Sequence, residues 1–487
     1  MNAAANTLEN NMQSPPTGIH AGIANPSLQK EGADSSGDKM KALVWEGKMK
    51  VKVEEALKPK VVDAKDIVIK VTGSTVGAII ELRKGDILGH ECMGIVDSVG
   101  PGVTKLKVGD RVVAGFNIGC GECFMCQKKL SSACQMTNDS ALMNTMYGGR
   151  TCGMLGYSHF TGGFAGGQAE FVRIPYGDAN CVKVPEGVYD EDALYISDSL
   201  VTSFHQVEDT RVDEGDIVGI WGVGVIGLLV GKWSILRGAS RLIAVDSVQW
   251  RLDYFKEKLL KDHPNVQIDL VNFSEHKNVV ARIHELTKAG TRGLPDTRPD
   301  GLDVAFECAA GEYAKGWAHK LEMVAGLETD TSEILNEMIE STIGFGRVGI
   351  TGVYAGYTNH FNIGSLMQRG IRYVRVVWNG RGRRHRRERA ETARNGLELI
   401  LPSRSFIGNG QAPTHKYMDR VMNDYIATGK VKPRELFVTH RVPIEDTDKV
   451  YYHMREHSEK TKIIKAFVAT AASSPPAPGA PPLTRIE

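Results

Sequence analysis

The 487-residue sequence has little of several features that define whole classes of protein. No apolar run reaches the roughly 20 residues that cross a bilayer, which argues against a membrane-spanning helix. The charges nearly cancel, with 59 Lys and Arg against 58 Asp and Glu, so no bulk field attracts nucleic acid or a membrane surface. Cysteine is sparse, with eight residues in the whole chain, which is too few for a fold built on disulfides.

The two ends of the chain differ in composition from the rest. Residues 1–38 contain no Arg and several acidic residues, so they fit neither a secretory signal nor a mitochondrial presequence. Residues 471–487 contain the run SSPPAPGAPP. We expect both ends to be disordered tails and the protein to be cytoplasmic and reduced. Hydrophobic residues make up 42% of the chain and charged residues 24%, which is typical of two or three ordinary globular domains at this length.

The strongest signal present is a set of four closely spaced cysteines. They follow the pattern C-x2-C-x2-C-x7-C and are Cys120, Cys123, Cys126 and Cys134. Zn²⁺ prefers tetrahedral sulfur ligation, and one short loop with this spacing can wrap a single ion. A disulfide and an iron–sulfur cluster are the alternatives, but the first suits an oxidising compartment and the second a closer spacing followed by proline. The loop predicts a structural zinc, because four protein ligands leave no position for substrate.

A glycine motif in a strand–loop–helix context predicts a dinucleotide site. The pattern G-x-G-x-x-G follows an apolar run at 216–221 and precedes a helical pattern that ends near residue 238. Its candidate cofactor-binding residues are Gly222, Gly224, Val225, Ile226 and Gly227. A second predicted strand, residues 242–245, ends at Asp246, where a carboxylate accepts the ribose 2′-hydroxyl and repels a 2′-phosphate, so NAD is favoured. Arg251 either flanks the adenine ribose or is a solvated helix residue.

Strands and helices continue to alternate after this motif. Apolar runs predict strands at 266–271, 302–306 and 347–353, and helices at 279–286 and 331–345. This alternation predicts an α/β fold with a doubly wound parallel sheet. An α/β domain without a nucleotide is the alternative, and the agreement between the glycines and Asp246 argues against it.

With these parts in place, the chain resembles the zinc-dependent medium-chain alcohol dehydrogenase family, and within it the glutathione-independent formaldehyde dehydrogenase branch. Besides the four-cysteine lobe, matching motifs lie at residues 89–91, 100–103, 108–112, 156–159, 162–170, 197–198, 326–333 and 357–364. The resemblance implies an α/β, medium-chain dehydrogenase architecture, with a partly β-barrel (GroES-like) catalytic domain plus a doubly wound Rossmann domain. We expect the catalytic domain at 39–200 with its zinc lobe at 117–136, the NAD-binding domain at 201–413, and a return to the catalytic domain at 414–470.

The resemblance also implies a second, catalytic zinc, held by a Cys, a His and an acidic residue with one position open to substrate. His90 and Asp198 match two of these ligands, and Glu91 matches a nearby acid that supports them. The residues alone leave other roles open, since His90 could be a core histidine and Asp198 a helix cap. The metal would polarise an alcohol oxygen while NAD accepts the hydride, so we expect oxidation of small alcohols or aldehydes, formaldehyde among them.

The sequence departs from the family at the cysteine ligand of that catalytic zinc. The family places a Cys-Gly-Ser-Asp-Leu-His segment after its Gly-Ser-Thr-Val run, whereas here Val76 is followed directly by Gly77. The ligand thiolate, the serine that relays the alcohol proton and a nearby histidine are therefore missing. Cys92 and Cys152 lie near matched motifs, but Cys92 is only two residues from His90, and a free Cys is usually a small buried hydrophobe.

A second departure is a basic insert at about residues 374–405. Its arginine cluster at 381–389 could contact nucleic-acid phosphates, but aromatic residues are scarce around it and the rest of the chain is neutral. We expect a disordered, solvated loop and no nucleic-acid or membrane partner. The insert interrupts the last strand of the cofactor sheet, which commonly lies at the subunit interface in this family. We therefore expect a homo-oligomer if the insert permits one.

Both departures have one explanation in a misassigned coding sequence, with one segment dropped and one intervening stretch translated. A peptide that spans Val76 and Gly77, found by mass spectrometry, would rule this hypothesis out. The alternative function is a catalytically silent NAD-binding protein that keeps only the structural zinc. A zinc-independent reductase is a third possibility, against which the presence of His90, Glu91 and Asp198 argues.

Overall fold

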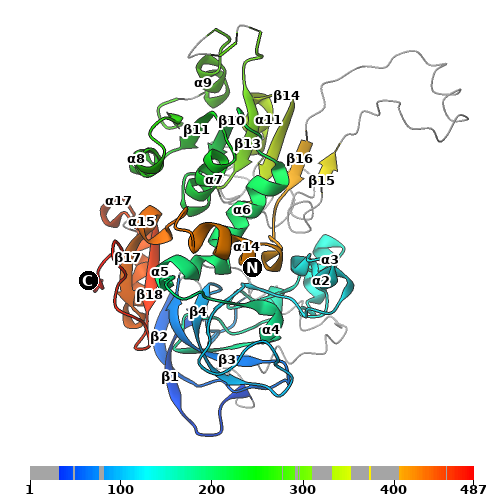
Figure 1. The fold of residues 1–487 in the computed structure, drawn as a ribbon, viewed down its shortest axis with the longest axis vertical. Helices are drawn as coiled ribbons and strands as arrows, with labels where there is room; N and C mark the ends of the chain where they lie inside the picture. The colour runs from blue at the N-terminus through cyan, green and yellow to red at the C-terminus, as the bar shows by residue number, and fades with distance from the viewer. Residues whose placement is uncertain are drawn as a thin grey trace, which may run out of the picture.

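The fold is known from a computed structural model, in which residues 32–47, 50–75, 82–276, 278–290, 294–295, 297–309, 332–352, 372–374, 405–456 and 458–486 are described. Figure 1 shows two sheet-based halves, one above the other, with helix α6 (Ser199–Thr210) between them. The domain boundary expected after residue 200 falls inside this helix.

The upper half is built on a parallel sheet. Among the described residues its seven strands run in the order β12 (Gln267–Asn272), β11 (Arg241–Asp246), β10 (Ile217–Trp221), β13 (Leu302–Glu307), β14 (Thr342–Ile350), β16 (Ser405–Gly408) and β15 (Arg372–Val374). All pairings are parallel except β15 with β16. The chain passes outward from β10 to β11 and β12 and then crosses to β13, which confirms the doubly wound sheet and puts its switch point between β10 and β13.

The strands and helices of this half follow from their apolar patterns. β10 and β11 are buried along their whole length, as expected for strands covered on both faces. The covering helices are α7 (Val225–Leu236), α8 (Gln249–Asp262), α9 (Val279–Leu286) and α11 (Glu333–Ser341). The bounds of α9 match the prediction.

The predicted helix at 331–345 is too long, and the following strand begins earlier than predicted. The helix ends at Ser341, and β14 begins at Thr342, which pairs with Leu302 of β13. The β-branched Thr342 and Ile343 and the glycines at 344 and 346 disfavour a helix, so the chain extends at this point.

The lower half is a strongly curved, mostly antiparallel sheet. Its order in the described residues is β17 (Val438–Pro443), β18 (Lys465–Ala469), β3 (Ile67–Ser74), β4 (Cys92–Val99), β5 (Arg111–Ala114) and β9 (Cys181–Lys183), with β8 (Phe171–Ile174) also paired to β3. The strands β1 (Lys39–Gly47) and β2 (Lys50–Leu57) form an antiparallel pair, as do β6 (Asn117–Ile118) and β7 (Gly153–Met154). Figure 1 shows the C-terminal strands beside the N-terminal ones, and Val468 of β18 pairs with Ser74 of β3.

Short helices complete the lower half and its connections. The α-helices are α2 (Phe124–Gln127), α3 (Ala141–Tyr147), α4 (Gly177–Asn180), α5 (Asp190–Ala193), α14 (Met418–Val421), α15 (Pro433–Leu436), α16 (Thr447–Glu456) and α17 (Ser458–Thr461). The 3₁₀ turns are η3 (Ser131–Ala133), η4 (His159–Thr161), η5 (Leu194–Ser197), η6 (Thr414–Lys416) and η8 (Ile444–Asp446), and η7 (Met422–Ile426) is a π-helix.

The prediction of a disordered C-terminal tail is wrong for residues 471–486. Leu483 bridges to Arg441 at the edge of β17, and Ile486 is buried among the side chains of β17 and α16. The carbonyl of Ser474 accepts a hydrogen bond from the Arg441 guanidinium. Proline and alanine do not prevent this packing, because an extended strap needs few backbone hydrogen bonds and Ile486 supplies the apolar anchor.

Two further expectations concern segments only partly inside the described residues. Residues 1–31 and 375–404, which hold most of the N-terminal tail and the basic insert, lie outside them, as does the junction between Val76 and Gly77. The ends of the insert are described, and Val374 pairs with Ser405 in the β15–β16 ladder.

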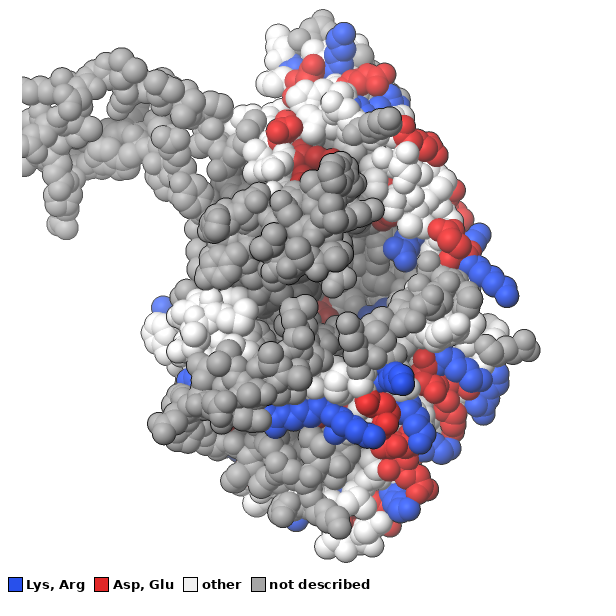
Figure 2. Space-filling view, turned by 180° about the vertical axis from the view of Figure 1, so that it is seen from behind, with Lys and Arg blue, Asp and Glu red and all other residues white. Residues whose placement is uncertain are grey.

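The surface carries both signs of charge. Figure 2 shows acidic and basic side chains interspersed over the visible described surface, with neither sign gathered into one field. In the described part of the chain, every helix is too short or too polar to traverse a bilayer.

Candidate metal and dinucleotide sites

The four cysteines of the predicted zinc lobe converge on one point. The Cys120 and Cys126 sulfurs are 3.9 Å apart, and those of Cys123 and Cys134 are 3.7 Å apart. All four lie within 4.8 Å of one another. A tetrahedral ion with Zn–S bonds of about 2.3 Å would separate its sulfurs by about 3.8 Å. The donor set and its spacing therefore fit a zinc ion that has four thiolate ligands.

The loop is already arranged to stabilise thiolates. The backbone amides of Glu122 and Cys123 both point at the Cys120 sulfur, at 3.5 and 3.3 Å. Contact with the Cys126 side chain is the largest cause that lowers the pKa of Cys134, to about 5, and the same contact raises the pKa of Cys126. Adjacent thiols cannot all ionise without a cation between them, so a divalent ion is the group that satisfies this cluster.

A half-buried histidine connects the lobe to the segment that follows β16. Asn180 donates to the carbonyls of Gly119 and Pro175, which leaves its Oδ1 as an acceptor. His415 Nε2 donates to that oxygen at 2.6 Å, and His415 Nδ1 contacts the Ser131 hydroxyl. Burial lowers the pKa of His415 to about 4, so the ring is neutral at physiological pH.

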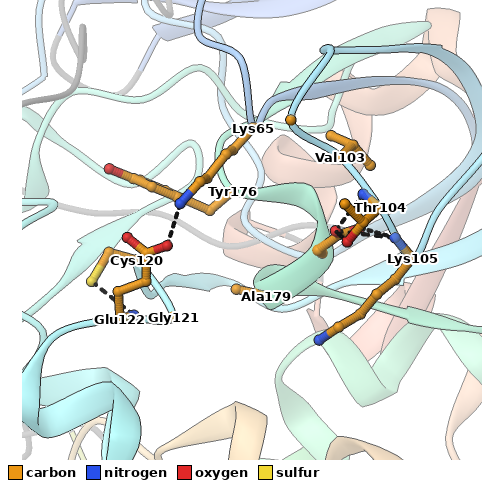
Figure 3. A pocket seen from close by; sticks show the side chains of 11 residues that line it. Lys65, Val103, Thr104, Lys105, Cys120, Gly121, Glu122, Tyr176 and Ala179 are labelled. Carbon is orange, nitrogen blue, oxygen red and sulfur yellow. Dashed lines mark hydrogen bonds and ion pairs between the residues drawn. The ribbon is translucent and has the colours of Figure 1, made fainter.

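A cavity of ≈ 250 Å³ opens beside the lobe and shares no residue with the other sites described below. Figure 3 shows Lys65 and Glu122 facing one another at its edge, where they form an ion pair, with Cys120 next to them. On the far side, the Asp178 carboxylate accepts bonds from the backbone amides of residues 104–106. The cavity therefore gives small solutes access to one ligand of the cluster.

The structure brings two residues of the predicted catalytic centre together. His90 precedes β4, Asp198 is the residue before α6, and Nε2 of the ring donates to Oδ2 of the carboxylate at 3.0 Å. The other ring nitrogen, Nδ1, is buried and has no partner among the described residues. Burial acts to raise the pKa of Asp198, but the hydrogen bond and charge of His90 outweigh it and hold the pKa below its usual value. The carboxylate is therefore ionised, as a metal ligand must be.

Glu91 does not join this pair. Its Oε1 accepts from both the backbone amide and the hydroxyl of Ser199, at 3.0 and 2.7 Å. Its Oε2 lies 2.5 Å from the Lys465 ammonium of β18. Both oxygens are occupied by structural contacts, so Glu91 supports the start of α6 next to Asp198, and a metal would have to displace these contacts to bind it.

Neither extra cysteine reaches the His90–Asp198 pair. Cys92 is buried within the core of the curved sheet, against residues such as Ile69 and Val96. Cys152 is buried beside Cys120 and Cys134 in the zinc lobe. In the described residues, the four-cysteine cluster is the one group of three or more His, Cys, Asp and Glu side chains close enough to hold an ion. The pair thus offers two donors for a zinc, and the described residues provide no third.

Several residues of this centre were missed from the sequence. The rings of Phe116 and Tyr157 pack edge-on against His90, with centroids at 5.8 and 5.3 Å. Thr202 donates to Asp198 Oδ1 from one turn further along α6. Thr202 could have been found by its i+4 spacing from Asp198, whereas the two aromatic residues come from other segments and carry no local signal.

The glycine loop has the shape that a pyrophosphate needs. Gly222 has φ of +85°, which other residues rarely adopt, and a Cβ on Gly227 would lie 2.0 Å from the Gly222 carbonyl oxygen. A Cβ on Gly224, which caps α7, would meet nothing within 4 Å, so this glycine faces open space. Val225 and Ile226 form the first turn of α7, where the backbone amides and the helix dipole favour an anion.

Asp246 lies against this loop at the end of β11. Its Oδ2 accepts from the Val223 amide at 2.9 Å and its Oδ1 from the Val248 amide at 3.0 Å. An ionised carboxylate oxygen can accept about two hydrogen bonds, so capacity for ribose hydroxyls remains. Arg251 is half-buried on α8, with its guanidinium 5.4 Å from the centre of the Trp250 ring. The loop, the helix start and Asp246 together fit a dinucleotide.

Comparisons with known proteins agree with this geometry. The alcohol dehydrogenase GroES-like domain family matches residues 61–186. A zinc-type alcohol dehydrogenase-like protein of Schizosaccharomyces pombe is 32% identical over 442 residues, which cover 89% of this chain and 92% of that protein. A glutathione-independent formaldehyde dehydrogenase of Pseudomonas aeruginosa is 31% identical over 281 residues, which cover 56% of this chain and 61% of that protein.

Solved structures show the same architecture. An alcohol dehydrogenase from Thermus sp. ATN1 superposes with a TM-score of 0.63 at 23% identity, over 88% of this chain and 100% of that one. At this identity the likeness establishes the fold: a GroES-like domain and a Rossmann domain.

Proposed function

Because this chain belongs to the zinc-dependent medium-chain alcohol dehydrogenase family, whose members are oxidoreductases that use zinc and a nicotinamide cofactor, we propose that it oxidises a small alcohol or aldehyde with NAD. Formaldehyde is included, since a relative over part of the chain is named a formaldehyde dehydrogenase. The observation that carries the proposal is the His90–Asp198 pair, which two distant segments place 3.0 Å apart beside a dinucleotide-binding fold.

The preference for NAD is argued from Asp246. Its carboxylate lies at the end of β11, against the glycine loop, with capacity for two hydroxyl donors. A 2′-phosphate at the same position would face this negative charge at close range, which disfavours NADP.

Each residue of the proposed catalytic centre has a separate role. His90 and Asp198 would hold a zinc ion, which supplies Lewis-acid polarisation of the substrate oxygen when bound. Glu91 and Lys465 fix the start of α6 and so the position of Asp198. Phe116 and Tyr157 pack edge-on against His90 and would hold the orientation of its ring. The glycine loop orients the cofactor that accepts the hydride.

The described residues offer the catalytic zinc two protein donors where the family uses three. We therefore expect one zinc per chain, at the cysteine lobe, together with NAD binding and little turnover. This expectation is also what favours the second candidate function, a catalytically silent NAD-binding protein.

Zinc content and turnover distinguish the dehydrogenase from the catalytically silent NAD-binding protein. Inserting Cys-Gly-Ser-Asp-Leu-His between Val76 and Gly77 should raise the zinc content from one to two ions per chain and give NAD reduction with formaldehyde or ethanol. The matched control carries Ser in place of the inserted Cys and should stay near one zinc. If the restored chain binds the second zinc and NAD but oxidises neither substrate, the proposed substrate class is wrong. If it gains no zinc, the His90–Asp198 assignment is wrong.

A further inference from the structure

Glu307 is a buried acid to which neither the sequence motifs nor the proposed reaction assigns a role. It is the last residue of β13, in register with Trp221 of β10 on one side and with Ile350 of β14 on the other. The side chain is fully buried. It therefore lies at the carboxyl end of the parallel sheet, the edge at which such folds bind dinucleotides.

Within the described residues, the Glu307 carboxyl group has backbone amides as partners and no charged one. Its Oε2 accepts from the Gly352 amide at 2.7 Å, while Oε1 is buried and has no hydrogen-bond partner among the described residues. No ion pair to it occurs in that part of the chain. A Cβ on Gly352 would lie 2.1 Å from Oε2, so the carboxyl group packs directly on the backbone that follows β14. An ionised carboxylate in this position would be uncompensated, which is costly.

The residues after Glu307 contact the glycine loop. The Cys308 amide donates to the Trp221 carbonyl at 2.8 Å, which continues the β10–β13 ladder to the start of the loop. A Cβ on Gly222 would lie 2.8 Å from the Ala309 amide nitrogen, so these two backbones are in close contact. Glu307 thus links the end of β14 to the segment that supports the first glycine of the loop.

Few ionisable groups belong to the segments near Glu307. Cys308 is adjacent, and burial raises the pKa of its thiol. Helix α6 presents the uncharged Gln206, which donates to the Glu307 carbonyl. Glu337 of α11 accepts from the indole of Trp221, the β10 residue in register with Glu307, and Asp246 lies beyond β10, on β11, where it accepts from the Val223 amide. Burial raises the pKa of Glu307 to about 8 against the opposing effect of the Gly352 and Ala309 amides, and no charged side chain is among the causes.

We propose that Glu307 is a positioning residue for the dinucleotide: as a neutral carboxyl it holds the ends of β13 and β14 against the glycine loop, and its ionisation weakens dinucleotide binding. The anionic form would add a buried negative charge at the carboxyl end of the sheet, next to the segment that contacts the glycine loop, and would strain the packing on Gly352. The proposal rests on the nicotinamide cofactor of the family and requires no turnover.

ADP-ribose is the probe, because it carries the pyrophosphate and lacks the nicotinamide that would approach the metal centre. If only the protonated form binds well, the apparent Kd of the wild-type chain rises about tenfold between pH 7 and pH 9. Glu307→Gln keeps the shape, accepts from the Gly352 amide and cannot ionise, so its Kd should stay flat over the same range. Glu257→Gln, exposed on α8, should behave as the wild type does.

A calorimetric measurement tests the same idea on the wild type alone. At pH 8.5, binding of ADP-ribose should take up about 0.8 proton per site, measured in two buffers of different ionisation enthalpy. Proton uptake near zero, an equal pH dependence in Glu307→Gln, or no binding of ADP-ribose by the wild type at pH 7 each overturns the proposal. Normal ADP-ribose binding without alcohol oxidation by the chain that carries the inserted segment bears on the proposed function only.

Discussion

Replacing Ile486 by Ala tests whether residues 471–486, the C-terminal strap, are part of the folded core. The side chain is 8% exposed and packs in a cluster with Val442, Ile444 and Val450. Removing its outer atoms loses their transfer free energy and leaves a cavity, which costs about 2–5 kcal/mol in a rigid core. Because the strap lies at the chain end and can partly collapse into the space, we expect about 2–3 kcal/mol.

The strap also provides hydrogen-bond partners to a buried ion pair, so its truncation should lower the free energy of unfolding more than Ile486→Ala does. Arg441 and Glu191 are both nearly inaccessible and pair with one another. The strap provides the Ser474 carbonyl to the Arg441 guanidinium and the Ala477 amide to Glu191 Oε1. Truncation after residue 472 removes both partners, and each buried group left unsatisfied costs about 1–3 kcal/mol in addition to the loss of Ile486.

Urea unfolding followed by tryptophan fluorescence measures both changes. Leu483→Ala is the matched control, because Leu483 is 55% exposed and its truncation should change the free energy of unfolding by no more than about 0.5 kcal/mol. The order of stability should be wild type and Leu483→Ala together, then Ile486→Ala, then the truncated chain. An Ile486→Ala chain with the wild-type midpoint would refute the packed strap and restore the disordered tail.

Three further predictions concern other parts of the molecule. Replacing residues 375–404 by Asn-Gly should join Val374 to Ser405 as a tight hairpin and raise the unfolding free energy by up to about 2 kcal/mol through loop closure; a lower thermal midpoint would show that the insert contributes packing. Cys126→Ser should abolish zinc retention after dialysis, whereas Cys181→Ser should retain it, and equal zinc contents would argue against the lobe as the metal site. Between about pH 4.5 and 8 the folded state keeps the Glu307 proton, whereas the unfolded chain has released it. The free energy of unfolding of the wild type should therefore fall as the pH rises, relative to that of Glu307→Gln, by up to about 1.4 kcal/mol per pH unit. Urea midpoints of the two chains that change in parallel between pH 5 and pH 8 would contradict this.

The features predicted well from the sequence are those encoded over a short stretch. The four cysteines lie within one loop, so their spacing alone indicates that their sulfurs can converge. The glycine pattern and Asp246 lie in one strand–helix–strand unit, whose geometry is nearly fixed by chain connectivity. The bounds of α9 follow from its apolar period.

The C-terminal strap shows why composition alone was misleading. Proline- and alanine-rich stretches lack a periodic apolar face, and the sequence shows no reason for order in the segment. The anchor is a single residue, Ile486, whose burial depends on β17 and α16, elements that the sequence does not place beside it. Only tertiary structure reveals that a receiving surface exists.

The adjacent residues His90 and Glu91 show the same limit at the proposed catalytic centre. The sequence places both in one metal site because they are neighbours, but successive side chains of an extended backbone point in opposite directions. In the structure His90 pairs with Asp198 and Glu91 pairs with Ser199, so both side chains contact the start of α6. Glu91 is then anchored by Lys465, a partner from the C-terminal strands that no local pattern could identify. In the proposed centre His90 is a ligand and Glu91 a support, so the zinc count of the restored chain should depend on Asp198 far more than on the Glu91 carboxylate.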